Sequence, residues 1–352
     1  MGMRTSGRLL LGMLGALVAA ELMLQVLPVS SATRTGYHHD PDLLTYPSQH
    51  EWTTSTGWDL RNPQRLRSNA WGFAAEREFV PDSRAIALIG DSYVEASMLE
   101  AEERPAAQLE RALDSSRPVY AMGSPGSALL DYAQRVRLAA KEFGVRDFVL
   151  LLEMSDARQS LCGSGNVHSR CLDKSTLERR VQRLPEAGFI KRIARHSALA
   201  QYFGGQIKLR PALLISAMFT RATPEAAEKV VGAATPGEPK PSEVAQAHRM
   251  VDAVVDAFFE DALPHLRGRL VVVVDAGRTE SRGRAPDLIA VERARMIERL
   301  ATGGALVVDL APVFAHQLGR SERSLVVGPY DGHMNALAVQ LAMTAAAERL
   351  AR

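Results

Sequence analysis

Two stretches of the chain, residues 85–156 and 269–352, alternate short apolar runs with longer amphipathic segments. The apolar runs occupy residues 85–90, 118–123, 147–154, 269–277 and 305–311. Continuous apolar runs of this length are typical of strands covered on both faces, as in a parallel sheet. Helical spacing of apolar residues predicts helices at 103–114, 127–144, 243–266, 286–302 and 336–352.

This alternation predicts the α/β fold class. We expect a three-layer α/β/α domain at 85–352 around a mostly parallel, flavodoxin-like five-stranded sheet with right-handed crossovers. Residues 175–268 interrupt the pattern and are predicted to be a helical insertion. Its Pro-, Ala- and Gly-rich part, 222–243, is expected to be a flexible linker. Residues 33–84 lack periodicity and are expected to pack on the core as an irregular segment.

The N-terminal residues 1–32 are predicted to be a membrane anchor or a signal peptide. Residues 9–29 form an apolar run that only Glu21 and Gln25 interrupt, and the eight residues before it hold two arginines. The length suits a membrane helix whose positive flank stays in the cytoplasm. The shorter apolar core before Glu21 and the small residues at 30–32 suit a cleaved signal instead. A buried helix of a soluble domain fits the position and flanks least.

Both of the first two interpretations export the body of the protein. An anchored protein would face the periplasm from a bacterial inner membrane, and a cleaved one would be periplasmic or secreted. Cys162 and Cys171, the two cysteines, lie in a Gly- and Ser-rich loop. In an oxidising compartment they are predicted to form a disulfide, with free thiols as the alternative. His168 lies between them, but no fourth ligand is near, so no metal site is predicted.

The charge balance changes the picture little. Lys and Arg number 42 and Asp and Glu number 40, which gives a net charge of +2. No basic field points to nucleic acid, and no nucleic-acid partner is predicted.

Candidate chemistry gathers where the predicted strands end. The first strand ends at residues 90–92, Gly-Asp-Ser, the second at 123–126, Gly-Ser-Pro-Gly, and the third at Ser155-Asp156. The loop before the last helix contains Asp331 and His333. Because open parallel sheets bind ligands beyond the carboxyl ends of their strands, these residues are expected to share one edge. A serine, a histidine, a carboxylate and glycine N–H groups are the groups that serine nucleophilic catalysis needs.

The order and positions of these blocks resemble the SGNH (GDSL-like) hydrolase and O-acyltransferase superfamily, in its exported bacterial type. The resemblance covers about 85–156 and 269–352. GDSY at 90–93 is similar to the nucleophile block, GSPG at 123–126 to the second block, and DGHMN at 331–335 to the last block. The third block, EMSDA at 153–157, stands where the family usually has Gly-x-Asn-Asp.

The resemblance implies a role for each matching residue. Ser92 is expected to be the nucleophile, His333 the base and Asp331 the carboxylate that orients it. The backbone N–H groups of Ser92 and Gly126 are expected to bind the oxyanion, with Ser155 as a weaker third donor. No cofactor or metal is implied.

Two departures from the family pattern bear on function. Ser155 stands in place of the asparagine, and the loss of one oxyanion donor costs about 10²–10³ in turnover unless it is replaced. The two-residue spacing from Asp331 to His333 looks like that of bacterial exopolysaccharide O-acetyltransferases of the same superfamily. The implied function is a serine esterase or O-acyltransferase acting on acyl groups, acetyl above all, of an extracytoplasmic carbohydrate or a small acyl ester. The alternative is a catalytically weak relative that binds glycan or envelope-assembly partners.

Overall fold

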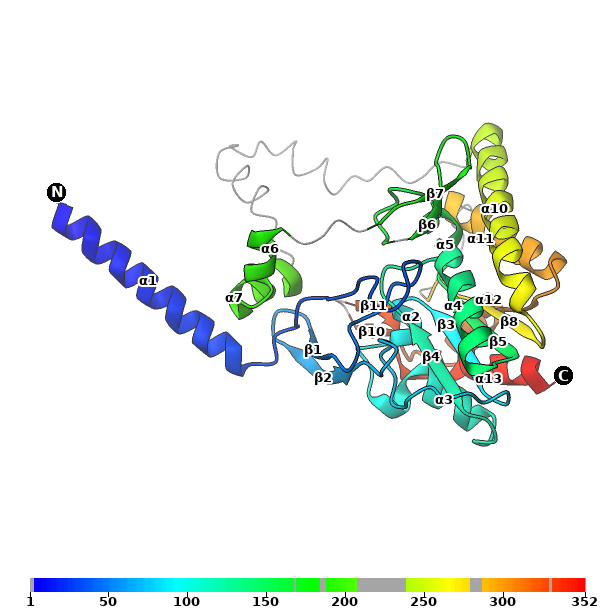
Figure 1. Ribbon diagram of the computed structural model, residues 1–352, viewed down its shortest axis with the longest axis horizontal. Helices are drawn as coiled ribbons and strands as arrows, with labels where there is room; N and C mark the ends of the chain where they lie inside the picture. The colour runs from blue at the N-terminus through cyan, green and yellow to red at the C-terminus, as the bar shows by residue number, and fades with distance from the viewer. Residues whose placement is uncertain are drawn as a thin grey trace. The chain divides into compact units, whose positions relative to one another are not determined.

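The chain forms two compact units, and Figure 1 shows their elements. The computed structural model describes residues 3–167, 169–183, 188–207, 239–278, 287–328 and 331–351. The smaller unit consists of Met1–Thr33, Glu51–Leu66 and Pro185–Ala234, and the larger unit of Arg34–His50, Arg67–Leu184 and Thr235–Arg352.

A five-stranded parallel sheet forms the centre of the larger unit. Its strands are β3 (Ile86–Gly90), β4 (Val119–Gly123), β5 (Asp147–Leu152), β8 (Leu270–Val274) and β9 (Leu306–Asp309). Their order across the sheet is β4-β3-β5-β8-β9, and every neighbouring pair is parallel. Numbered along the chain, this order is 2-1-3-4-5, the flavodoxin-like order. The predicted fold class is therefore confirmed, with each strand within the range expected from the sequence.

Two apolar layers cover the sheet, because successive side chains of a strand point to opposite faces. Ala87 and Ile89 of β3 face one core and Ile86 and Leu88 face the other. The first core includes side chains of α4 (Leu129–Phe143), α5 (Asp156–Gln159), α10 (Pro241–Ala262) and α11 (Leu288–Thr302). The second includes side chains of α2 (Ser92–Glu95), α3 (Pro105–Ala112), α12 (Leu310–Leu318) and α13 (Ala336–Ala351). These layers form the predicted α/β/α sandwich.

Several elements differ from the sequence-based expectations. The segment predicted to be irregular contains the antiparallel pair β1 (Glu51–Thr56) and β2 (Arg61–Arg67), and β6 (Arg170–Leu172) pairs with β7 (Arg179–Val181). The helix α10, which the predicted insertion included, packs against α4 and α11 as part of the core. Most of the predicted linker at 222–243 lies outside the described residues.

The remaining elements are short, apart from the N-terminal helix. They are α1 (Met3–Val26), η1 (Ala101–Glu103), α6 (Phe189–Ala194), α7 (Ala198–Ala200), the π-helical turn η2 (Gln201–Gln206), η3 (Leu263–His265), β10 (Val326–Gly328) and β11 (Asp331–Met334). In α1, the stretch Gly7–Val26 is long and apolar enough to cross a membrane, by length and composition alone.

Glycines end the first two strands because the chain passes close over them. A Cβ on Gly90 would lie 2.6 Å from Val94 Cγ2 and 2.8 Å from the carbonyl oxygen of Leu151. A Cβ on Gly123 would lie 2.5 Å from the backbone nitrogen of Glu95. The glycine of the Gly-Asp-Ser triplet thus allows α2 to start directly above the sheet.

We expect Gly90→Ala to destabilise the fold by about 2 kcal/mol, since the added methyl must displace backbone in a packed core. Chemical denaturation would measure the loss. Gly277→Ala is the matched control, because a Cβ there meets nothing within 4 Å. Equal stability of the two variants would contradict the close approach at Gly90.

Candidate active site

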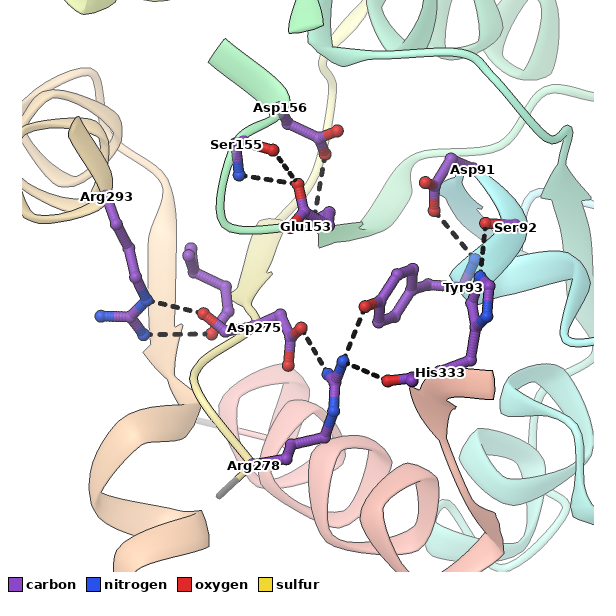
Figure 2. Close-up of polar contacts among 12 residues, drawn as sticks. Asp91, Ser92, Tyr93, Glu153, Ser155, Asp156, Asp275, Arg278, Arg293 and His333 are labelled. Atoms are coloured by element: carbon purple, nitrogen blue, oxygen red, sulfur yellow. Dashed lines mark hydrogen bonds and ion pairs between the residues drawn. The ribbon is translucent and has the colours of Figure 1, made fainter. Parts of the chain in front are cut away.

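The structure brings Ser92, His333 and Asp331 together in hydrogen-bonding order, although 241 positions separate the first two. Figure 2 shows Ser92 and His333 of this group. Ser92 Oγ lies 2.9 Å from His333 Nε2. His333 Nδ1 lies 2.5 Å from Asp331 Oδ1, which also accepts the backbone N–H of His333 at 2.9 Å. The side chains of His333 and Asp331 are 32% and 17% exposed, so both are partly accessible to solvent.

The two-residue spacing from Asp331 to His333 follows from secondary structure. Both residues lie on β11, which pairs with β10. Residues i and i+2 of a strand point to the same side. The carboxylate and the imidazole therefore lie side by side on one face of β11, and this position allows the hydrogen bond between them.

Ser92 is positioned by the start of α2. Asp91 caps this short helix, and its Oδ1 accepts the backbone N–H of Tyr93 at 2.8 Å. Burial raises the pKa of Asp91 to about 6, although the bond from Tyr93 and the nearby His333 act in the opposite direction. The carboxylate of Asp91 thus stabilises the helix start at which Ser92 lies.

Strand register places the other predicted residues at the same edge of the sheet. Gly90 pairs with Gly123 of β4 and with Leu151 of β5. Because the strands are parallel, the residues that follow them, Ser92, Gly126 and Ser155, leave the sheet at one edge. Gly126 has a φ of +79°, which favours glycine.

The hydroxyl of Ser155 is engaged by a neighbouring carboxylate (Figure 2). Ser155 Oγ donates to Glu153 Oε2, which also accepts the Ser155 backbone N–H at 2.8 Å. Gln159 Nε2 donates to Ser155 Oγ at 2.8 Å. The only hydroxyl proton of Ser155 therefore goes to Glu153, a residue that the sequence-based prediction left out.

We expect Ser155→Ala to change the turnover of an aryl acetate by less than about threefold, because a hydroxyl proton held by Glu153 is not donated to an oxyanion. Removal of a true oxyanion donor costs about 10²–10³. Steady-state kinetics would separate the two cases. A loss of a hundredfold or more would show that Ser155 turns to the substrate.

Arg278 joins the two segments that carry the serine and the histidine. Its Nη2 donates to Tyr93 Oη and to the carbonyl of Gly332, both at 2.7 Å, and its guanidinium lies 5.3 Å from the centre of the Tyr93 ring. The Tyr93 and His333 rings are 5.0 Å apart. Figure 2 shows Arg278 between these residues and Asp275. Because Tyr93 follows Ser92 and Gly332 precedes His333, Arg278 is a positioning residue.

Asp275 holds Arg278 through an ion pair. Its side chain is fully buried, and this burial raises its pKa. The sequence contains a signal for this pair, because Asp275 directly follows the fourth strand, at the carboxyl edge that Ser92, Gly126 and Ser155 also share. The prediction applied that rule to the first three strands and missed the fourth.

Glu95, at the end of α2, is a buried carboxyl beside the site. Tyr46 Oη donates to its Oε2 at 2.9 Å. Burial raises the pKa of Glu95 from 4.5 to about 7, and hydrogen bonds from Tyr46 and Ser97 only partly offset this effect. The folded state therefore keeps a proton that the unfolded chain releases between about pH 4.5 and pH 7.

Because the folded state binds this proton more tightly than the unfolded chain, Glu95 contributes its full stabilisation below about pH 4.5. The contribution is lost as the pH rises through 7. At about 1.4 kcal/mol per pKa unit, the loss is about 3 kcal/mol. We therefore expect the Tm of Glu95→Gln, relative to wild type, to rise from pH 5 to pH 8. Glu102→Gln, at an exposed position, should show no such trend. A flat difference for Glu95→Gln would refute the shift.

The predicted disulfide is confirmed: Cys162 and Cys171 are bonded. The loop that it closes contacts the turn after β4, since the Val167 N–H donates to the carbonyl of Gly126 at 2.7 Å. Asn166 Nδ2 of the same loop donates to Gln159 Oε1 at 2.6 Å. The disulfide loop therefore borders the site, and His168 lies outside the described residues. The part of the chain that the structure describes contains no group of three His, Cys, Asp or Glu side chains that could hold a metal ion.

Solved structures similar in fold to this protein share little sequence identity with it. No model of a known family matches the sequence, and no curated protein matches it. Similar solved structures include a member of the lipolytic G-D-S-L family from Veillonella parvula, with 10% identity, a TM-score of 0.39, and coverage of 76% of this chain and 98% of that one. A carbohydrate acetylesterase from Sinorhizobium meliloti has 10% identity, a TM-score of 0.36 and coverage of 76% and 98%. An acetylxylan esterase from Geobacillus stearothermophilus has 10% identity, a TM-score of 0.40 and coverage of 77% and 95%. At such TM-scores, function has to be argued from the residues of the site itself.

Proposed function

We propose that the protein is an SGNH-type serine esterase or O-acyltransferase that cleaves ester-linked acyl groups, acetyl above all, on an extracytoplasmic carbohydrate. The observation that carries this proposal is the hydrogen-bonded order of Ser92, His333 and Asp331 at the carboxyl edge of the sheet. A nucleophile, a base and an orienting carboxylate in this order are the recurring arrangement of serine acyl transfer on unrelated folds.

The mechanism begins with a proton transfer. Asp331 accepts a hydrogen bond from the Nδ1–H of His333 and keeps the proton on Nδ1, so that Nε2 takes the proton of Ser92 as Oγ attacks the ester carbonyl carbon. The His333 imidazolium then protonates the leaving alcohol, and the carbonyl reforms as an acyl-Ser92 ester. Water gives hydrolysis of this ester, and a sugar hydroxyl gives transfer of the acyl group.

Backbone donors stabilise the oxyanion in this mechanism. Among the residues that the structure describes, the N–H groups of Ser92 and Gly126 donate to no other protein atom. They leave neighbouring strands of one sheet edge and are preorganised by the cap of α2 and by the left-handed turn at Gly126. With Ser155 held by Glu153, these two donors carry most of the stabilisation.

The proposed location is outside the inner membrane, with α1 retained as an anchor. Support comes from the apolar stretch Gly7–Val26 and from the Cys162–Cys171 bond, which is typical of oxidising compartments. The carbohydrate substrate is proposed from the exported location and from the resemblance to the SGNH superfamily, and so by analogy of fold.

The alternative, a relative that binds glycan without turnover, is favoured by one observation, the engagement of Ser155 by Glu153. A fluorophosphonate probe decides between them. We expect the folded, oxidised protein to be labelled and mass spectrometry to place the label on the peptide that contains Ser92. If the wild-type protein is not labelled, the esterase proposal is wrong and the alternative, glycan binding without turnover, is supported.

A further inference from the structure

The two polar residues within the apolar part of α1, Glu21 and Gln25, bond to the segment at 196–199, where α7 starts. The Glu21 carboxylate accepts hydrogen bonds from Ser197 Oγ at 2.8 Å and from the backbone N–H groups of Ala198 (2.8 Å) and Leu199 (2.9 Å). Gln25 Nε2 donates to the same carboxylate at 2.6 Å. A carboxylate on an apolar helix is costly in lipid unless it is paired. Here it caps another helix, which fixes the start of α7 to α1.

This contact sets the level of α7 on the membrane helix. Glu21 lies five residues before Val26, the end of α1, or about 8 Å along the helix axis. With Gly7–Val26 spanning the acyl region of a bilayer, that level lies about 8 Å inside the boundary between acyl chains and headgroups, a depth that interfacial helices reach. The helix α6 ends at Ala194, and α7 begins at Ala198. The short connection keeps α6 near the same boundary.

The helix α6 has one apolar face, formed by Phe189, Ile190 and Ile193, which are 68%, 82% and 57% exposed. Positions three and four apart share one side of a helix. By the same spacing, a cationic face on the other side consists of Lys191, Arg192 and Arg195.

The smaller unit also contains exposed aromatic residues outside α6. Phe203 of η2 is 43% exposed and Trp58 of the β1–β2 turn is 63% exposed. The two are linked by Tyr202, whose Oη donates to the carbonyl of Trp58 at 2.7 Å. Tryptophan is enriched at the interface between membrane and water.

We propose that α6 is a second membrane contact, which lies in the surface of the bilayer that α1 enters. The apolar face enters the acyl boundary, and the cationic face binds the phosphates of anionic lipids. The segregation of the two faces on a helix tied to an apolar span is what an interfacial helix requires. This inference rests on the anchored location proposed above and not on the esterase activity.

Lipid quenching of single labels on the full-length protein tests it. The native cysteines are bonded to each other, so Ile190→Cys introduces the only free thiol for a fluorescent label. The protein would be placed in nanodiscs of phosphatidylethanolamine and phosphatidylglycerol that carry a nitroxide on the acyl chain. We expect the label at 190 to lose about half of its fluorescence or more, as a label inserted at the acyl boundary does. Adding Lys191→Glu and Arg192→Glu should weaken the quenching.

Two further labels make the outcome decisive. Leu14→Cys, within α1, should be quenched, and Glu142→Cys, at an exposed position of the larger unit, gives the background. Quenching at 14 with only background quenching at 190 would overturn the contact of α6. Concentration-dependent shielding of 190 without lipid quenching would indicate a second copy of the chain and would also overturn it. No quenching at 14 would remove the anchor and this inference, while fluorophosphonate labelling would still report separately on the esterase.

Discussion

Ser92→Ala is expected to lower the turnover of an aryl acetate by about 10⁴–10⁶, because no other group can form the acyl-enzyme. Ser92 Oγ is the oxygen within hydrogen-bond distance of His333 Nε2, so its removal leaves the base without a proton to take. The oxyanion donors remain, and so does a residual rate above the uncatalysed reaction. Ester hydrolysis, measured by steady-state kinetics, and fluorophosphonate labelling should both be lost.

Ser116→Ala is the matched control for this variant. Ser116 lies before β4, at the opposite end of the strands, and its hydroxyl donates to the carbonyl of Leu113. Its turnover should equal that of the wild type. If Ser92→Ala, folded as judged by an unchanged Tm, kept more than a tenth of the activity, Ser92 would not be the nucleophile.

Asp331→Asn is expected to lower kcat by about 10³–10⁴ with little change in KM, because the imidazole loses the partner that fixes its tautomer. The asparagine Oδ1 can still accept the backbone N–H of His333, as Asp331 does at 2.9 Å, so β11 should keep its shape. The loss would then lie in the chemical step, and the rate of fluorophosphonate labelling should fall with kcat.

Asp82→Asn controls for the general effect of losing a carboxylate. Asp82 accepts the backbone N–H of Arg84 at 2.9 Å before β3, at the amino end of the strands. Its activity should be unchanged. A loss of less than tenfold in Asp331→Asn would assign the orientation of His333 to another group.

The Glu153–Ser155 pair shows where the sequence alone could not decide. The chain position of Ser155 after the third strand was readable, and the missing amide was apparent. The direction of its hydroxyl depends on Glu153 and Gln159, whose side chains converge on it only after β5 and α5 are packed. The three residues are close in sequence, but the direction of their side chains depends on the turn between β5 and α5, which periodicity does not specify.

Arg278 illustrates the same limit over a longer distance. Its three partners come from residues 93, 275 and 332, and strand order decides which of these meet. Asp275, at the end of a strand, was a readable signal, while the bridge from Tyr93 to Gly332 was not. The two interruptions of α1, Glu21 and Gln25, likewise gained a reason only from their bonds to the segment at 196–199.

The sequence by itself determined the parallel α/β sandwich and its five strands. It predicted the Cys162–Cys171 disulfide with free thiols as the alternative, and it predicted that Ser92, Gly126 and Asp331-x-His333 gather at one edge. These features depend on local periodicity and on the rule that parallel strands share a carboxyl edge. The tertiary structure alone decided that β11 holds Asp331 and His333 on one face, that Glu153 takes the hydroxyl of Ser155, and that Arg278 ties the serine segment to the histidine segment. The first two contacts join residues two positions apart, whose side chains meet because of the local backbone conformation that the folded protein fixes. The third joins side chains that are distant in sequence and become neighbours only when the layers pack.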